Sequence, residues 1–529
     1  MSRGKNEGDP VWGLEFSQLD VFARNISMDY LALGVDVLIG VVMLPFNVAH
    51  LGQSTYGLWV LVASVTAYFS MLDLGYGVAQ VKFASEYRAR RDAEGLNQII
   101  SSLFFVFCII GLLAVSLGFL LALNLDKFFN ITPEQASTGR TVLMIISAYV
   151  ALGFPASVFG GIVNGFQRHY INGFVSISTS LVVAAVNVAV LLAGYGLVEL
   201  VAATATIRAL SYIGYGMNAY RAFPGLRLRL SKVRLTRLRE VTGFSAFILL
   251  IDLANKVNYA SDALVIGAFM GTVAIAIWAV AQRLIDATQM ITGQLNGALF
   301  PIMVDNATLG QTDRLREIFI QGTRISLAMV IPIATGLCLL AGPLVMAWVG
   351  PEFVGSIPII YVLAIAVAIR VGNSSATTLL KGSGRHRLLA TSNLVIAVAN
   401  LGLSVALIRP LGLIGVALGT LIALAIVSVL VLFPAACRRV KLSTTEALKT
   451  AILPALWPAL FMASFLAITR NVAGPSLAAI ALQSITAGLI YLAVFMMFAI
   501  DREERQWYIS KARQLVKRQN AVAEGLGQV

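Results

Sequence analysis

Long apolar runs without strand-like alternation recur along the whole chain, and short stretches of Gly, Pro, Asn and charged residues separate them. Such runs predict transmembrane helices, because about 20 apolar residues in a helix cross the hydrocarbon layer of a membrane. The pattern predicts about fourteen helices, with approximate limits 24–46, 56–82, 99–123, 141–163, 172–193, 199–220, 241–267, 273–300, 318–341, 357–380, 388–408, 411–434, 450–469 and 475–499. No connection between them is long enough to fold as a separate domain.

The composition agrees with this interpretation. Hydrophobic residues make up 58% of the 529 residues and charged residues only 12%, whereas a soluble protein carries about 25% charged residues. This excludes a soluble enzyme, a disordered protein and a disulfide scaffold, and it predicts an all-α polytopic membrane protein. Three cysteines without CxxC spacing and three histidines make a metal site or a redox pair unexpected, so no cofactor is predicted.

The basic residues set the predicted topology. The formal charge is +13, and an N-terminus in the cytoplasm would place 31 of the 39 Lys and Arg residues on the cytoplasmic side and four on the other. Basic loops face the cytoplasm in membrane proteins, so the excess points to topology rather than to nucleic acid. We therefore expect an even number of spans with both termini in the cytoplasm, and no cleaved signal peptide, because residues 1–20 contain no apolar core.

Two halves of the chain resemble each other locally. Three matches recur at a nearly constant offset: Leu51-Gly52 with Met270-Gly271, 165–169 with 382–386, and 196–198, which leads to Thr204, with 412–414, which leads to Thr420. In the first match each Gly also stands seven residues before a tryptophan, Trp59 or Trp278. The repeat unit is six helices, which is even, so the copies share one orientation and form two lobes. The alternative is that Gly and Trp simply occur at helix ends in any membrane protein. The expected organisation is a cytoplasmic tail (1–20), an N-lobe (21–220), a basic linker (221–240), a C-lobe (241–436), and two extra helices with a cytoplasmic tail (437–529).

Several stretches resemble a known family. They are Leu51-Gly52, Tyr56-Gly57, Trp59, Ser64, Tyr68, Leu72-Asp73-Leu74-Gly75, Phe300-Pro301, 348–353, 380–385 and 412–415. In this order they resemble the polysaccharide exporters, the Wzx-type lipid-linked oligosaccharide flippases of the MOP superfamily. The resemblance covers about residues 20–435.

The resemblance implies a function and a location. Members of that family move undecaprenyl-diphosphate-linked sugar repeat units from the inner to the outer leaflet of the bacterial inner membrane. The units feed O-antigen, capsule or exopolysaccharide assembly. The expected partners are the anionic lipid-linked oligosaccharide, the bilayer and polysaccharide assembly proteins.

Charged residues inside the predicted spans are the candidate site residues. Each charge at a span's centre costs about 2.5–3.5 kcal/mol on insertion scales. The bases Arg208, Lys256, Arg283 and Arg370 are predicted to bind the diphosphate in a central cavity. The acids Asp36, Asp73, Asp252 and Asp286 are predicted to bind a coupling proton or Na⁺ or to act in gating.

A structural alternative stays open for several of these charges. Asp252 and Lys256 are spaced i,i+4, and Arg283 and Asp286 are spaced i,i+3, so each pair could neutralise itself on one helix face. Asp73 lies in the family-like Leu-Asp-Leu-Gly stretch and is compatible with a packing or gate role.

The segment 221–239 carries seven bases interleaved with leucines. This composition suits a segment lying on the anionic inner leaflet, and it equally suits a loop that only sets topology.

Two other functions compete with a flippase. A cation-coupled multidrug antiporter of the MATE type would have twelve spans and a more acidic cavity. The acid Asp36 in the first predicted span nevertheless leaves this alternative open. A membrane enzyme would need a catalytic group on an extended outer loop, and the outer loops are short, so no enzyme is predicted.

Overall fold

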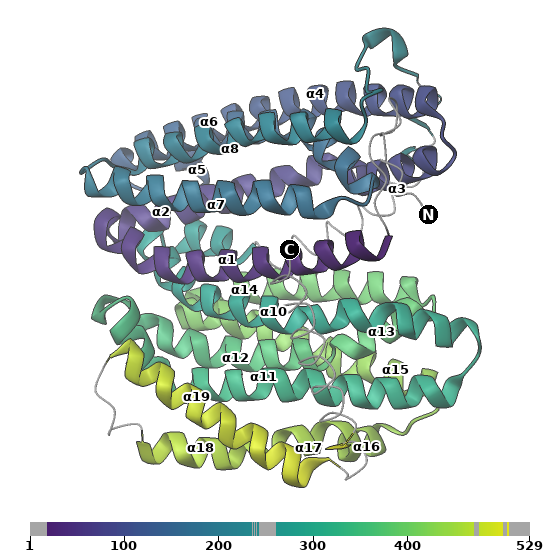
Figure 1. Cartoon of the computed structure of the whole chain (residues 1–529). Coiled ribbons are helices and arrows are strands. Elements are labelled where there is room, and N and C mark those ends of the chain that lie inside the picture. The colour runs from purple at the N-terminus through teal and green to yellow at the C-terminus, as the bar shows by residue number, and fades with distance from the viewer. Residues whose placement is uncertain are drawn as a thin grey trace, which may run out of the picture. The chain divides into compact units, whose positions relative to one another are not determined.

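The computed structural model describes residues 18–234, 236, 238–239, 241–242, 261–469, 476–500 and 505–506. All regular secondary structure in this part of the chain is helical (Figure 1). The α-helices are α1 Gln18–Leu51, α2 Gln53–Ala67, α3 Tyr76–Ala89, α4 Ala93–Leu123, α5 Leu125–Phe128, α6 Pro133–Gly165, α7 His169–Leu192, α8 Leu197–Ala222, α10 Thr272–Thr308, α11 Thr312–Trp348, α12 Ile357–Gly372, α13 Ser374–Gly382, α14 His386–Val427, α15 Phe433–Arg439, α16 Thr444–Ala447, α17 Leu453–Leu456, α18 Pro458–Thr469 and α19 Leu477–Val494. Short 3₁₀ turns are η1 Tyr68–Asp73, η2 Leu230–Lys232 and η3 Pro351–Ser356, and π turns are η4 Ser428–Leu432, η5 Leu448–Ile452 and η6 Phe495–Ala499.

Eleven helical stretches of the described chain are long and apolar enough to cross a membrane. Each overlaps a predicted span, and the stretch His386–Arg439 covers the two predicted spans 388–408 and 411–434. The predicted span 273–300 is helical as part of α10 but is not one of the eleven, and most of the predicted span 241–267 lies outside the described residues. The all-α polytopic fold is therefore confirmed, and the count of fourteen stays a prediction.

The apolar run predicted as one helix over 56–82 is divided in the structure. Helix α2 tightens into η1, and Leu74 and Gly75 then take positive φ angles of 53° and 78° before α3 begins. The Asp73 carboxylate accepts a hydrogen bond from the Gly77 main-chain N at 3.0 Å, which satisfies one of the free N–H groups at the start of α3. The Leu-Asp-Leu-Gly stretch is thus a helix break with its own cap.

The contacts divide the chain into two compact units. The first comprises Met1–Ala287 and Asn393–Ala423, and the second comprises Thr288–Ser392 and Leu424–Val529. Helix α10 runs from the first unit into the second. The stretch labelled α14 consists of two helices that meet at Gly412 (φ 59°, ψ −140°), and its two ends belong to the second unit. The boundaries predicted for the two lobes stay a prediction.

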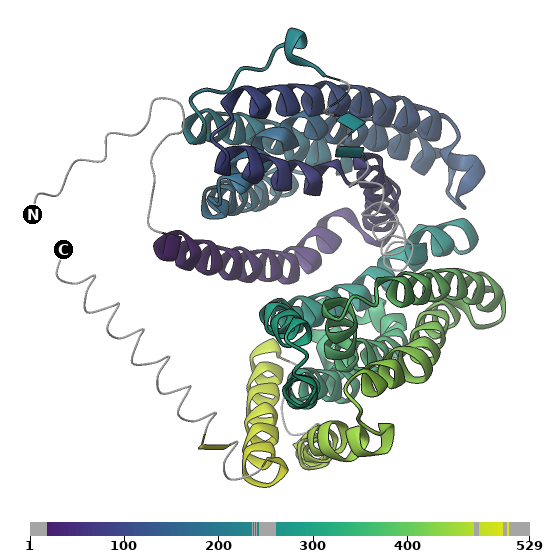
Figure 2. The same cartoon turned by 90° about the vertical axis from the view of Figure 1, so that its right-hand side faces the viewer.

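Within each unit, neighbouring helices pack against one another. In the first unit, α4, α6 and α8 lie side by side (Figure 1), and Phe69, Phe107 and Phe154 are buried in one of its cores. In the second unit, α18 and α19 contact each other and both contact α11; they are drawn yellow-green and yellow in Figure 2.

Backbone conformation repeats along the chain at two of the matched positions. Gly52 and Gly271, from the first match, both have positive φ angles (78° and 89°) directly before a helix. Gln167 and Gly384 occupy equivalent places in the second match, and both also have positive φ angles (62° and 75°). The short sequence matches therefore mark turns of the same handedness.

At the third match, the corresponding threonine of each half of the chain forms a hydrogen bond between side chains. Thr204 donates to Asn187 Oδ1 at 2.8 Å, and Thr420 donates to Asn400 Oδ1 at 3.1 Å. The two threonines keep the offset of this match, and the two asparagines come close to it. The internal repeat that the sequence predicted therefore has counterparts in the structure.

Candidate functional site

The first compact unit contains a polar cavity of about 540 Å³ between α1, α2, α7, α8 and α10. Its lining includes Asp36, Gly40, Asn47, Tyr56, Trp59, Ser180, Asn187, Thr204, Arg208 and Arg283. Three of the sequence-predicted charges, Asp36, Arg208 and Arg283, thus line one cavity although they lie on three different helices. Charges are tolerated at membrane depth where they face a cavity and hydrogen-bonding groups rather than lipid.

Arg283 of α10 reaches across to α1. Its Nη2 donates to the main-chain oxygen of Asp36 at 3.1 Å, and its Nε is buried without a hydrogen-bond partner among the described residues. The guanidinium lies directly against Gly40, and a Cβ added at Gly40 would overlap its Nη2 and Cζ atoms. Only glycine leaves room on α1 for this side chain, so Gly40 fixes where the guanidinium lies.

The side chain of Asp36 makes a contact of its own, with helix α7. Its carboxylate accepts a hydrogen bond from Ser180 Oγ of α7 at 3.2 Å, and the side chain is exposed. A cavity lined by an accessible carboxylate and by guanidinium groups offers acceptor oxygens for a cation and donors for an anion.

Uncharged polar groups complete the lining. Asn47 is 6% exposed and its Oδ1 has no hydrogen-bond partner in the described part of the chain. Tyr56 and Trp59 of α2 meet edge to face, with ring centroids 6.0 Å apart. The cavity therefore presents amide, hydroxyl and aromatic surfaces beside its charges, which is a combination that binds sugars as well as anions.

Other predicted site residues lie elsewhere. Arg370 of α12 belongs to the second unit and donates to Gln289 Oε1 at 3.1 Å. Asp286 accepts from Gln282 Nε2 at 2.7 Å, one helical turn away on α10, and Asp73 caps α3. Lys256 and Asp252 lie outside the described residues. The roles assigned to these five residues stay predictions, and so do the roles of Asp36, Arg208 and Arg283.

Four uncharged members of the cavity, Asn47, Ser180, Asn187 and Thr204, were not among the site residues predicted from the sequence. Ser180, Asn187 and Thr204 are polar residues inside predicted spans, and Asn47 directly follows the predicted span 24–46, so polarity in or beside an apolar run was the available signal. Gly40 gave none, because glycine is common in transmembrane helices.

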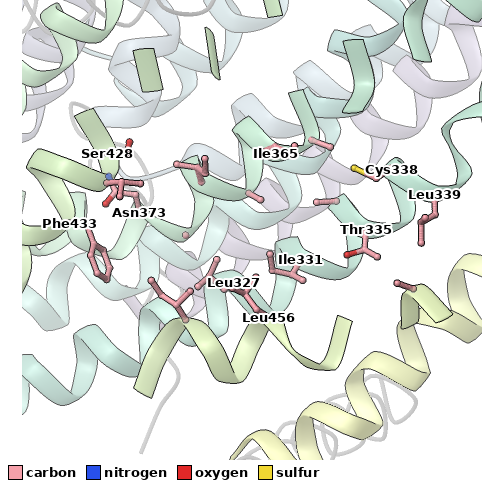
Figure 3. Close-up of a pocket in the computed structure, with 18 residues that line it drawn as sticks. Leu327, Ile331, Thr335, Cys338, Leu339, Ile365, Asn373, Ser428, Phe433 and Leu456 are labelled. Atoms are coloured by element: carbon pink, nitrogen blue, oxygen red, sulfur yellow. The ribbon is translucent and has the colours of Figure 1, made fainter. Parts of the chain in front are cut away.

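The second compact unit contains an apolar cavity, also of about 540 Å³ (Figure 3). Leu327, Ile331 and Leu456 point toward one another in it, and Thr335, Asn373 and Ser428 are among its few polar members. No group of three or more His, Cys, Asp or Glu side chains that could hold a metal ion occurs in the described part of the chain.

Residues 22–307 of the chain match the family described as "Polysaccharide biosynthesis protein". The chain belongs to this family. The resemblance to the polysaccharide exporters that the sequence predicted is thereby confirmed.

Two bacterial relatives have informative names. The chain is 22% identical to the "Uncharacterized membrane protein EpsK" of Bacillus subtilis over 93% of this chain and 98% of the relative. It is 25% identical to the "Succinoglycan biosynthesis transport protein ExoT" of Rhizobium meliloti, over 32% of this chain and 34% of the relative.

Solved transporters share its fold. The "Lipid II flippase MurJ" in an inward closed conformation aligns with a TM-score of 0.71 and 14% identity, over 89% of this chain and 98% of the flippase. An inward-facing "multidrug resistance MATE family transporter of the MOP superfamily" aligns with a TM-score of 0.61 and 14% identity, over 79% of this chain and 98% of that transporter. The protein is thus a multi-pass membrane protein with the helical fold of these transporters.

Proposed function

We propose that the protein is a flippase that moves undecaprenyl-diphosphate-linked oligosaccharide repeat units from the inner to the outer leaflet by alternating access. The observation that carries this proposal is a polar cavity among apolar helices with Arg208 and Arg283 in its lining. A diphosphate needs cationic donors when it leaves water, and a guanidinium offers two parallel N–H groups to phosphate oxygens. No covalent step is required.

The rest of the lining suits the sugar. Hydroxyl and amide groups such as Ser180 and Asn187 exchange hydrogen bonds with sugar hydroxyls, and the Trp59 ring offers an apolar face. The names of its relatives support a polysaccharide precursor, since one relative is a succinoglycan biosynthesis transport protein and one protein of the same fold is a lipid II flippase. The proposed location is the bacterial inner membrane with both termini in the cytoplasm.

Asp36 is the proposed coupling residue. Its carboxylate is exposed in the cavity and hydrogen-bonded by Ser180, so a proton or Na⁺ bound there would change the charge that the diphosphate meets. In the same proposal Arg370 and Lys256 join the cationic path of the diphosphate, and Asp73, Asp252 and Asp286 act in coupling or gating.

A multidrug antiporter is the second candidate. The MATE-like fold and the carboxylate of Asp36 favour it. The two arginines in the same cavity oppose it, because a cationic drug would meet two positive charges there.

Deletion of the gene tests both candidates. Surface polysaccharide and lipid-linked repeat units are measured in the deletion strain and after complementation with the wild type, Arg283→Ala or Arg140→Ala at matched expression. Arg140 is the control, because it forms an ion pair of 3.0 Å with Asp126 and does not line the cavity. A flippase requires loss of polysaccharide with precursors accumulating inside, restored by Arg140→Ala but not by Arg283→Ala. Intact polysaccharide with new sensitivity to cationic dyes would establish the antiporter instead.

A further inference from the structure

The segment that follows α8 folds back over the start of α4 (Figure 1). Residues 225–234, which we call the basic strap, hydrogen-bond to polar side chains on the first three turns of α4 through their main chain. Asn97 makes the first contact: its Nδ2 donates to Gly225 O at 2.9 Å, and its Oδ1 accepts from Arg227 N at 2.5 Å. A side-chain amide that donates to one carbonyl and accepts from the N–H two residues further along a passing backbone holds that backbone in one register.

Two serines continue the attachment one turn further along α4. Ser101 Oγ donates to Arg227 O at 3.3 Å and lies 3.3 Å from Arg229 N, which donates to it. Ser102 Oγ accepts from Arg234 N at 2.9 Å. The basic strap is thus attached at its start, its middle and its end.

The attached backbone alternates its side chains between two sides. Arg229 is extended (φ −143°, ψ 139°), and successive residues of an extended chain point in opposite directions. Leu226 is buried and Leu228 packs against the same core of the first unit, whereas Arg227 and Arg229 are exposed. The leucines fasten the strap inward, so the arginines are directed outward.

The outward face carries a surplus of positive charge. Arginine side chains are exposed at 221, 227, 229, 234 and 239. The acid beside the strap, Glu94, is engaged by Lys232 of the strap itself at 2.6 Å. Leu230, at the η2 turn between these arginines, is 70% exposed.

The position of the strap places this surplus at a membrane surface. It follows the end of α8 and covers the beginning of α4, and both helices are long and apolar enough to span. Acidic phospholipids give a membrane surface a negative potential that attracts basic segments within a Debye length, and an exposed leucine beside them can enter the interface.

We infer that the basic strap is a docking surface for the headgroups of acidic phospholipids, with Arg227 and Arg229 on the lipid phosphates. Because the hydrogen bonds to α4 already order the backbone, little further ordering accompanies binding. The inference does not depend on which cargo the cavity carries.

The full-length protein in lipid nanodiscs tests it. The thermal midpoint is measured in phosphatidylcholine discs and in discs in which part of that lipid is phosphatidylglycerol. The variants are Arg227→Gln/Arg229→Gln and, as a control, Arg385→Gln/Arg387→Gln. The control removes the same charge at the same spacing from two exposed arginines of the second unit.

We expect phosphatidylglycerol to raise the thermal midpoint of the wild type and of the control by similar amounts. The rise for Arg227→Gln/Arg229→Gln should be less than about half of the wild-type rise. About 1 M salt should remove the rise, because screening then acts within about 3 Å. An equal rise in all three proteins, or an equal loss in both variants, would overturn the inference. So would an equal rise with inorganic phosphate in phosphatidylcholine discs, which would show that the arginines bind free anions rather than a lipid surface.

Discussion

The two cavities of this protein have the same volume, about 540 Å³, and opposite linings. The cavity of the first unit gathers Asp36, Arg208 and Arg283 from three helices, whereas the cavity of the second unit is lined mainly by Leu, Ile and Ala side chains. Size therefore does not distinguish them. The difference lies in what the neighbouring helices provide: α1 offers Arg283 a main-chain oxygen at Asp36 and free space at Gly40. Charged side chains in a membrane protein are tolerated where such hydrogen-bonding groups meet them.

The largest expected effect comes from placing the same charge in both cavities. Ala364 is fully buried in the apolar cavity, and Ala63 is an exposed member of the polar cavity. We expect Ala364→Asp to abolish folded protein, because an aspartate at the centre of a span costs about 2.5–3.5 kcal/mol and the described residues that line this cavity include no basic side chain. Ala63→Asp should fold, because it faces a cavity with two arginines. Size-exclusion profiles of the two variants decide, and similar recovery of both would remove the contrast between the cavities.

The next effect tests the contact that holds Arg283. Gly40→Ala puts a Cβ onto the Arg283 guanidinium, which is the far end of a flexible side chain and can move aside. The protein should therefore fold while the guanidinium is displaced. A displacement of about 1 Å can lower a rate about 100-fold, so we expect polysaccharide export to fall by that order.

Gly34 supplies the control for this prediction on the same helix. No heavy atom of the described residues lies within 4 Å of a Cβ added at Gly34, so Gly34→Ala should keep wild-type export. Arg283→Lys in the Gly40→Ala background should restore part of the export, because the slimmer lysine tolerates the added methyl group. Equal export by Gly40→Ala and Gly34→Ala would show that the position of Arg283 does not matter.

The sequence predicted the chemistry of these regions better than their shapes. Counting charges in apolar runs found Asp36, Arg208 and Arg283, because a charge in a span is rare enough to stand out. It could not find Gly40, whose role depends on how close α10 comes to α1. It also overlooked the break at Leu74-Gly75, because hydropathy is a property of composition and continues through a left-handed turn that only backbone angles reveal.

A smaller effect is expected at Asp36. Asp36→Asn keeps the hydrogen bond from Ser180 possible and removes one negative charge beside Arg283. If the carboxylate couples transport to an ion, export should fall several-fold and lose its dependence on the proton or Na⁺ gradient. Export by inverted vesicles with and without each gradient measures this. An unchanged gradient dependence would exclude Asp36 as the coupling residue.

The smallest effect uses the internal repeat as its own control. Asn187 and Asn400 accept equivalent hydrogen bonds from Thr204 and Thr420, but only the first pair lines the polar cavity. Asn187→Ala and Asn400→Ala should each lower stability by about 0.6 kcal/mol, which is the average for hydrogen bonds between transmembrane helices. Export at matched protein levels should fall only in Asn187→Ala, by a few-fold, because that side chain also faces the cargo. If both variants lose export equally, the two hydrogen bonds support packing alone. Asn187 would then contact the cargo no more than Asn400 does, although only Asn187 lines the polar cavity.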